Sequence, residues 1–204
     1  MKFGGTSVAN LSRIKNLQQL VKNKILSGHR KIIVVVSAMS GVTNDLVKQY
    51  KKIDSDINKP EYDVILSTGE QYSSALISTF LNKNGVRSRS ILGWQVPIIT
   101  DNKFSQARIE RIDTEKILKL FKKFNVLVVA GFQGISPEGR ITTLGRGGSD
   151  TSAVAMAVAL KSKICEIYTD VEGIFSSDPR VVRDAKKIKN ITYEEILEMA
   201  SLGS

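Results

Sequence analysis

The sequence predicts an α/β fold in which a mostly parallel β-sheet is covered by helices on both faces. Short β-branched runs such as residues 32–36 carry no polar side chain, as do strands buried on both faces of a sheet. Between these runs lie segments whose apolar residues recur every three or four positions, which is the period of an amphipathic helix. Strands that alternate with helices form parallel sheets, because each helix carries the chain back to the same edge.

Four strands are expected. Residues 31–37 and 126–130 are the most apolar runs, residues 164–169 have a similar pattern, and residues 88–92 form a weaker strand. Cys165 is expected to be a small core residue within its strand.

Five helices are expected. Gly28 and Gly85 follow the first two and terminate them. Asp113 or Thr114 caps the third, and Thr192 opens the fifth with the spacing of a capping box. These helices cover, in chain order, residues 14–25, 65–81, 117–124 and 153–160, and a segment that begins at Thr192.

Composition narrows the class of protein. Of the 204 residues, 30 are basic, 20 are acidic and 42% are hydrophobic, and the net charge is +10. The hydrophobic fraction is enough for a buried core, and the basic residues form no long run, so they indicate solvated surfaces rather than a nucleic-acid groove. The longest apolar run is too short to cross a bilayer. The single cysteine excludes a disulfide framework and a cysteine-based zinc site, and it suits the reducing cytoplasm.

The turns that follow the strands are where parallel α/β sheets bind ligands. In the first turn, Gly4 and Gly5 allow backbone N–H groups to approach an anion, and Lys2 offers a point charge for a phosphate. Paired glycines also occur in plain tight turns, and this segment matches neither the P-loop nor the Rossmann glycine pattern. A phosphate site and a tight turn both fit these residues.

Two further segments offer groups for a small ligand. After residue 36, small and hydroxyl residues lead to Thr43 and Asn44, which fit a binding pocket or a helix cap equally well. Gly69 interrupts a helical apolar pattern at a cost of about 1 kcal/mol relative to alanine, which indicates a close approach of backbone. Glu70 beside it can then bind an ammonium group, although an exposed glutamate on a helix is the more ordinary interpretation.

The strongest local signal is the glycine-rich segment at residues 142–151. Its three glycines precede a helix of small residues, whose positive end favours an anion. Arg146 within the loop suits bidentate binding of a carboxylate or a phosphate. Asp150 fits either a functional carboxylate or an N-cap, and the glycines around the arginine favour function.

The segment after the last strand offers groups for a nucleotide. Thr169 and Asp170 can contact a ribose or a base, and Arg180 can reach a phosphate. Asp178 and Pro179 are also an ordinary turn signal, which accounts for part of this segment.

Six segments of the sequence together resemble the aspartokinases of the amino acid kinase family. Each is modest alone, but they occur in the family's order and cover almost the whole chain, which makes the resemblance specific. They are residues 2–9 (KFGGTSVA), 36–44 (VSAMSGVTN), 67–70 (STGE), 129–134 (VAGFQG), 143–150 (TLGRGGSD), and 169–173 (TDVEG) with 178–180 (DPR).

The resemblance implies a three-layer α/β/α sandwich and a phosphoryl transfer from ATP to the side-chain carboxylate of L-aspartate, which gives 4-phospho-L-aspartate. It also implies Mg²⁺ and a cytoplasmic role in lysine, threonine and methionine biosynthesis. Such chemistry needs positioning and charge neutralisation rather than a protein nucleophile. The glycines, hydroxyls and few cations of the turns agree with this. No metal-ligating side chains and no nucleic-acid or membrane partner are expected.

The resemblance also implies a role for each candidate residue. Lys2 stabilises charge on the transferred phosphoryl group, and Asp150 orients Lys2 or organises the reacting centre. Glu70 binds the ammonium group of aspartate, and Arg146 binds its α-carboxylate. The other substrate-binding residues are Thr43, Ser149 and, more weakly, Asp63, and the nucleotide-binding residues are Lys2, Phe3, Gly4, Gly5, Thr169, Asp170, Phe175 (a Tyr in many members) and Arg180.

Two departures from the family pattern bear on activity. The chain starts directly before Lys2, so the first strand is expected to be a stub, and it ends where the family continues with more catalytic structure and paired ACT regulatory domains. Residues 1–204 are therefore expected to be an incomplete catalytic domain, whose pairing into a homo-oligomer is weakened. Two alternatives stay open: an impaired fragment that binds ATP or another subunit, and a sister kinase that acts on another small acid.

Overall fold

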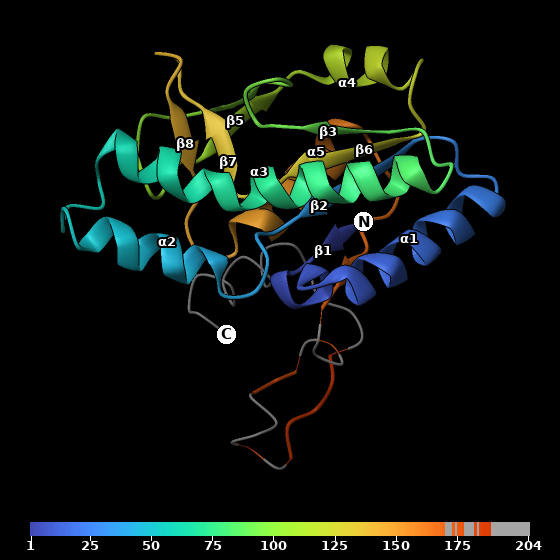
Figure 1. The fold of residues 1–204 in the computed structure, drawn as a ribbon, viewed down its shortest axis with the longest axis horizontal. Coiled ribbons are helices and arrows are strands. Elements are labelled where there is room, and N and C mark those ends of the chain that lie inside the picture. Colours follow the sequence, from blue (N-terminus) through green and yellow to red (C-terminus); the bar gives the residue numbers. More distant parts are fainter. Residues whose placement is uncertain (170–172, 174, 178–181, 183, 189–204) are drawn as a thin grey trace. The chain divides into compact units, whose positions relative to one another are not determined.

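The computed structural model describes residues 1–169, 173, 175–177, 182 and 184–188. The chain divides into two compact units, Met1–Tyr168 and Thr169–Ser204. The first unit contains a five-stranded sheet in the order β3-β6-β2-β1-β9, in which every pair of neighbouring strands is parallel (Figure 1). Its strands are β1 (Lys2–Phe3), β2 (Ile32–Val36), β3 (Ser88–Ile91), β6 (Val126–Ala130) and β9 (Ile167–Tyr168).

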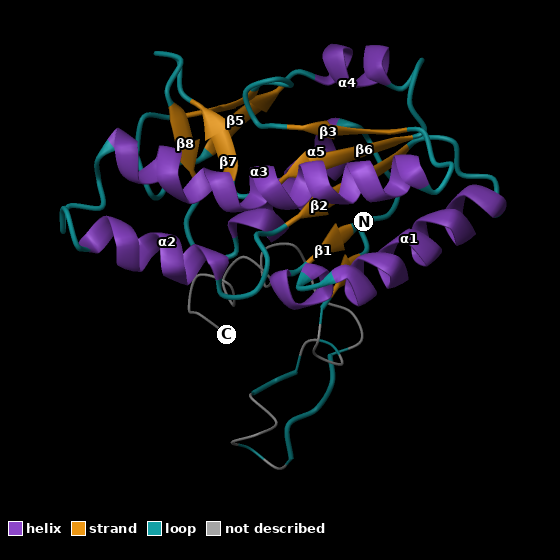
Figure 2. Ribbon diagram, in the orientation of Figure 1, coloured by secondary structure: helices purple, strands orange, loops and turns teal. Residues whose placement is uncertain are grey.

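Helices cover both faces of this sheet (Figure 2). α1 (Leu11–Leu26) and α3 (Pro60–Lys83) pack on one face, and α4 (Thr114–Leu120) and α5 (Gly148–Ala159) pack on the other. α2 (Val42–Lys51) packs against α3, and the short 3₁₀-helix η1 (Gly5–Val8) precedes α1. The predicted three-layer α/β/α sandwich with a mostly parallel sheet is thus confirmed.

Alternate residues of the central strands β2 and β6 define the two layers of the core. Val34 and Val128 are buried against the helices of one face, where they meet Ile77 of α3. Val35 points to the other face and belongs to the cluster that contains Met156 of α5. Because each fully buried aliphatic side chain contributes about 1.5–3 kcal/mol, these layers hold the strand ends in fixed register.

Local signals fix where the helices begin. Asn10 caps α1, because its side chain accepts a hydrogen bond of 3.0 Å from the N–H of Arg13. Asp113 caps α4 through the N–H of Lys116 at 3.2 Å, as the sequence predicts. Pro60 stands in the first turn of α3, where its missing N–H costs no hydrogen bond.

A second, four-stranded sheet was not predicted. Its order is β5-β4-β7-β8, with antiparallel outer pairs and a parallel central pair. The buried hydroxyls of Thr100 and Thr142 share a hydrogen bond of 2.6 Å within it. Its last strand leads directly into the glycine-rich loop before α5. The strands are β4 (Ile98–Thr100), β5 (Ile109–Ile112), β7 (Gln133–Ile135) and β8 (Ile141–Thr143).

One expectation about α3 is confirmed and one about α2 is wrong. α3 runs unbroken through Gly69, and the predicted close approach occurs there, because a Cβ at Gly69 would lie 2.7 Å from the Cβ of Ala38 in the segment after β2. α2 is capped by Gly41 in the left-handed conformation (φ 87°) and not by Thr43 or Asn44, which lie inside the helix.

The end of the chain differs from the expectation too. β9 is shorter than the predicted strand, and Cys165 is exposed rather than part of the core. In the second unit, Phe175 forms an antiparallel bridge with Lys187. The helix expected from Thr192 lies outside the described residues. Across the described segments, no helix is both long enough and apolar enough to span a bilayer.

Candidate active site

The carboxyl ends of β1, β2 and β6 converge at one edge of the parallel sheet. The N–H of Ser37 donates to the carbonyl of Phe3 at 3.1 Å, and the N–H of Gly131 donates to the carbonyl of Val36 at 3.0 Å. These bonds continue the sheet by one residue beyond the strands. The three turns that follow the strands therefore meet, as expected for a ligand site in a parallel α/β sheet.

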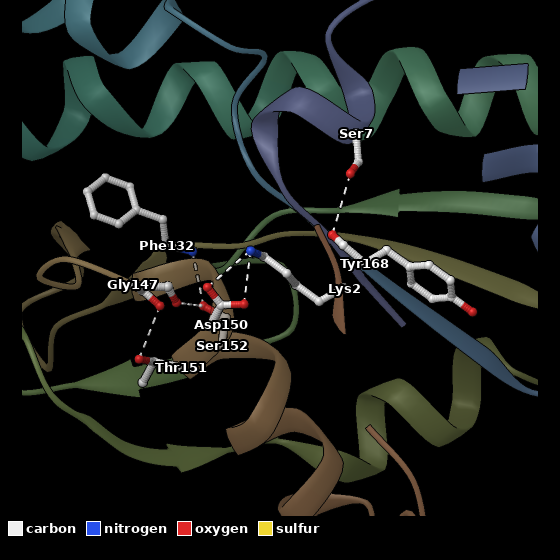
Figure 3. Close-up of polar contacts among 9 residues, drawn as sticks. Lys2, Ser7, Phe132, Gly147, Asp150, Thr151, Ser152 and Tyr168 are labelled. Carbon is white, nitrogen blue, oxygen red and sulfur yellow. Dashed lines mark hydrogen bonds and ion pairs between the residues drawn. The ribbon is translucent and has the colours of Figure 1, made fainter. Parts of the chain in front are cut away.

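Lys2 and Asp150 form an ion pair across this edge (Figure 3). The Nζ of Lys2 lies 2.9 Å from Oδ1 and 3.0 Å from Oδ2 of Asp150. The Lys2 side chain is 9% exposed, whereas that of Asp150 is 42% exposed. A buried ammonium group is stable only beside a charge partner, so Asp150 holds the ammonium group in place. The structure thus brings together two predicted catalytic residues that lie 148 positions apart in the sequence.

The start of α5 is built around glycines. Gly147 caps the helix with a left-handed backbone (φ 70°), so Asp150 lies in the first helical turn and is not the N-cap. Gly131, directly after β6, allows Ser149 to approach closely: a Cβ at Gly131 would lie 2.9 Å from both the Oγ and the Cβ of Ser149. The end of β6 and the first turn of α5 are therefore packed with no spare volume.

Gly131→Ala is expected to lower the free energy of unfolding by about 1–3 kcal/mol, the usual cost of overpacking, and to displace the first turn of α5. Urea denaturation measures the change in the free energy of unfolding. Gly145→Ala is the matched control, because a Cβ at Gly145 meets no atom within 4 Å. Equal stability of the two variants would show that the contact between Gly131 and Ser149 relaxes without cost.

The turn after β1 is held by backbone contacts. The N–H of Gly4 donates to the carbonyl of Tyr168 at 3.2 Å, so in this arrangement it is not free for a phosphate. The Phe3 side chain is buried and stacks on the ring of Tyr168 with centroids 4.6 Å apart, so it belongs to the core rather than to a nucleotide pocket. A Cβ at Gly5 would lie 2.7 Å from the carbonyl oxygen of Ala38, which joins this turn to the one after β2.

Glu70 is buried rather than exposed. Its side chain lies on α3, where only 4% of the residue is accessible, and its Oε2 has no hydrogen-bond partner within the described segments. Burial raises the pKa of the Glu70 carboxyl to about 7, and hydrogen bonds from the N–H of Ala38 and from its own N–H oppose the rise. A buried carboxylate oxygen without a donor is suited to a ligand that brings one.

Asp63 has a different environment. Its carboxylate is fully buried and accepts hydrogen bonds from the N–H of Ser105 at 2.9 Å and from the N–H and Oγ1 of Thr143 at 2.6 and 2.8 Å. Burial raises the pKa of Asp63, and these hydrogen bonds oppose the rise. Both oxygens are used within the protein, and Thr143 directly precedes the glycine-rich loop. Asp63 thus holds the start of that loop in place through its hydrogen bonds with Thr143.

Some of the remaining predicted residues lie in the described part of the chain, and others lie outside it. Arg146 is exposed, and it makes no ion pair with any described residue. Thr43 is half-buried in the first turn of α2. Thr169 and Phe175 belong to the second unit. Asp170 and Arg180 lie outside the described residues.

Phe132 was not predicted as part of the site. It has a left-handed backbone (φ 68°), which is uncommon for a residue with a bulky side chain. Its N–H donates to the Oγ of Ser152 at 3.0 Å, and its carbonyl accepts a hydrogen bond of 2.8 Å from the N–H of Leu144 (Figure 3 shows the contact with Ser152). Phe132 thereby ties the end of β6 to α5. The sequence feature that could have identified Phe132 is the Gly131–Phe132 pair, which directly follows the apolar run at residues 126–130.

Comparison with known proteins identifies the family of this chain. The model of the amino acid kinase family matches residues 1–204. The chain is 49% identical to an aspartokinase of Rickettsia felis and 52% identical to an aspartate kinase of Stutzerimonas stutzeri, in each case over 100% of its own length. It spans about half of these relatives, 51% and 49% of their lengths.

Solved structures show the same likeness. The aspartate kinase of Synechocystis superposes with a TM-score of 0.79 at 47% identity, over 99% of this chain and 33% of that one. Aspartokinase III of E. coli in complex with aspartate and ADP superposes with a TM-score of 0.82 at 30% identity, over 98% of this chain and 55% of that one. With its whole length matched by the family model and its fold shared with these structures, this chain belongs to the amino acid kinase family.

Proposed function

We propose that this chain catalyses, or carries the machinery for, phosphoryl transfer from ATP to the side-chain carboxylate of L-aspartate. The observation that carries the proposal is the buried ammonium group of Lys2, held by Asp150 at the edge where three parallel strands end. The likeness to aspartokinases, one of them solved with aspartate and ADP, supports the choice of both substrates.

Charge is the main obstacle to this reaction, because a carboxylate must approach a polyphosphate. Lys2 supplies a positive charge whose position is already fixed by Asp150, so little reorganisation is needed when negative charge develops on the transferred group. The N-terminus of α5 adds its positive end at the same edge. As the bond from the aspartate oxygen to the γ-phosphorus forms, the bond from phosphorus to the bridging oxygen breaks, and ADP leaves.

Recognition of aspartate needs an anion site and a cation site. Arg146 is exposed in the loop before α5 and suits bidentate binding of the α-carboxylate. Glu70 suits the ammonium group, because its buried Oε2 lacks a hydrogen-bond donor. Ser149 of α5 and Thr43 of α2 supply hydroxyl groups. Asp63 positions the loop that carries Arg146 by accepting a hydrogen bond from the N–H of Thr143.

The nucleotide brings most of the ligands that Mg²⁺ needs. In the described part of the chain no three His, Cys, Asp or Glu side chains cluster in a way that suits a metal ion. Mg²⁺ in proteins commonly keeps several waters and is held by phosphates with one or two carboxylates, so the residues fit an ion that arrives with ATP. Asp150, whose side chain is 42% exposed, is the carboxylate at this edge that would face it.

The wider role follows from the same reaction. We propose that the product enters lysine, threonine and methionine biosynthesis through diaminopimelate, and that the protein works in the cytoplasm without a nucleic-acid or membrane partner. The unpaired Cys165 is consistent with a reducing compartment. Under this proposal, residues 1–204 are the catalytic domain of a longer kinase. Its subunits form homo-oligomers through regions outside these residues.

A coupled assay for ADP tests the proposed function. Formation of ADP should require both L-aspartate and Mg²⁺, and hydroxylamine should trap the acyl phosphate as a hydroxamate. L-glutamate is the matched control substrate, since it differs from aspartate by one methylene. Turnover with glutamate and not with aspartate would contradict the proposal that aspartate is the substrate. Because the chain spans half of its relatives, nucleotide binding without turnover would instead identify a fragment that binds ATP.

A further inference from the structure

Glu70 combines three properties that seldom occur together. It is 4% exposed, its Oε2 has no partner in the described part of the chain, and it forms no ion pair there. Ionising such a carboxyl costs free energy, because no cation replaces the lost hydration. Glu70 therefore favours the protonated form more than an exposed glutamate does, and burial raises its pKa to about 7.

The charged groups on the elements around Glu70 do not offset this cost. Lys2 of β1 is paired with Asp150 of α5. On α2, which packs against α3, Asp45 and Lys48 are exposed and lie 3.6 Å from each other. The interactions that act on Glu70 are burial and two backbone N–H groups, its own and that of Ala38. Its charge state thus depends on what a ligand brings.

We propose that an amino acid enters this site with the loss of a proton from Glu70, so that its binding is coupled to pH. The ligand's ammonium group donates a hydrogen bond to Oε2, the carboxyl becomes a carboxylate, and the displaced proton passes to solvent. The ion pair with the ammonium group offsets the cost of ionisation, which the free protein avoids at low pH by keeping Glu70 protonated. This inference rests on the proposed function, because it takes the ligand to be aspartate or a close analogue.

The coupling has a definite sign. Only the ionised form of free Glu70 accepts the ammonium group, so the apparent affinity is the intrinsic affinity multiplied by the ionised fraction. With a pKa of about 7, aspartate should bind about tenfold more weakly at pH 6 than at pH 8. About half a proton should be released for each aspartate bound at pH 7, and about 0.9 at pH 6.

Isothermal titration calorimetry of this chain with L-aspartate tests the coupling without any need for turnover. Titrations at pH 6, 7 and 8, each in two buffers of different ionisation enthalpy, give the number of protons released. Release that falls from pH 6 to pH 8 is the expected result. Binding with no proton release at pH 6 would overturn the proposal while leaving the proposed function intact, whereas absence of aspartate binding at every pH would overturn both.

Two variants identify the group that loses the proton. Glu70→Gln is expected to bind aspartate more weakly, with no proton release between pH 6 and pH 8. Glu61→Gln is the matched control on the same helix, because Glu61 pairs with Arg140 at the surface at 2.6 Å; it should keep the proton release of the unmodified chain. Release that persists in Glu70→Gln would assign the proton to another group and overturn the inference.

Discussion

Replacement of Lys2 by methionine is expected to lower the rate of aspartate-dependent ADP formation by about 10³-fold, the typical effect of removing one fixed positive group from the transferred phosphoryl. Methionine keeps the length and the buried apolar stem, so the effect comes from the charge. Because Asp150 is 42% exposed, it can be hydrated once its partner is lost, and the fold should survive. Aspartate affinity, measured by calorimetry, should change little.

Lys48→Met is the control for this loss of charge. Lys48 is exposed on α2 and lies 3.6 Å from Asp45, where a surface ion pair is worth less than about 1 kcal/mol. Its rate should match that of the unmodified chain. If Lys2→Met and Lys48→Met had the same rate, the ammonium group of Lys2 would have no part in the chemical step.

Glu70→Gln is expected to stabilise the protein, even though it removes a binding group. The pKa of Glu70 rises from 4.5 to about 7 on folding, so the folded state holds the proton more tightly than the unfolded state. Stability is therefore lost as the pH rises from about 4.5 to about 7, and the total loss is about 3 kcal/mol. Glutamine is neutral at every pH and avoids this loss.

Urea denaturation at two pH values measures the effect. Glu70→Gln should be more stable than the unmodified chain by about 3 kcal/mol at pH 8 and by about 1 kcal/mol at pH 5. Glu115→Gln is the control, since Glu115 is exposed on α4 and its loss should change stability little at either pH. A pH-independent difference would mean that packing, not ionisation, sets the stability of the Glu70 variant.

The central layers of the fold were predictable because their signals are local. The runs at residues 32–36 and 126–130 contain only apolar side chains, and α1 has one apolar stripe and an Asn cap. The second sheet was not predictable in this way. Its strands have three or four residues, and Thr100 and Thr142 are buried through a hydrogen bond that only the tertiary fold creates. No alternation of apolar and polar residues marks them.

The candidate site shows the same division. The order of motifs pointed to Lys2, Glu70 and Asp150, and the structure places Lys2 and Asp150 in contact. Sequence alone left open whether Glu70 is exposed, because burial depends on how α3 packs on the turn after β2 through Gly69. The left-handed backbone of Phe132 was missed for a similar reason, since its support comes from Ser152 on a distant helix.

The position of β1 in the sheet has a consequence for how the protein matures. On one edge this strand pairs with β2, where Lys2 aligns with Val35, and on the other with β9, where Lys2 aligns with the distant Ile167. Both edges of β1 are therefore paired only after β9, the later of its two partners along the chain, has been synthesised. Pairing over such sequence distances is slow, because the chain loses the entropy of loop closure before the stabilising contacts form. The Lys2–Asp150 ion pair likewise needs α5, so a nascent chain that has not yet reached Asp150 lacks the charged centre of the proposed site.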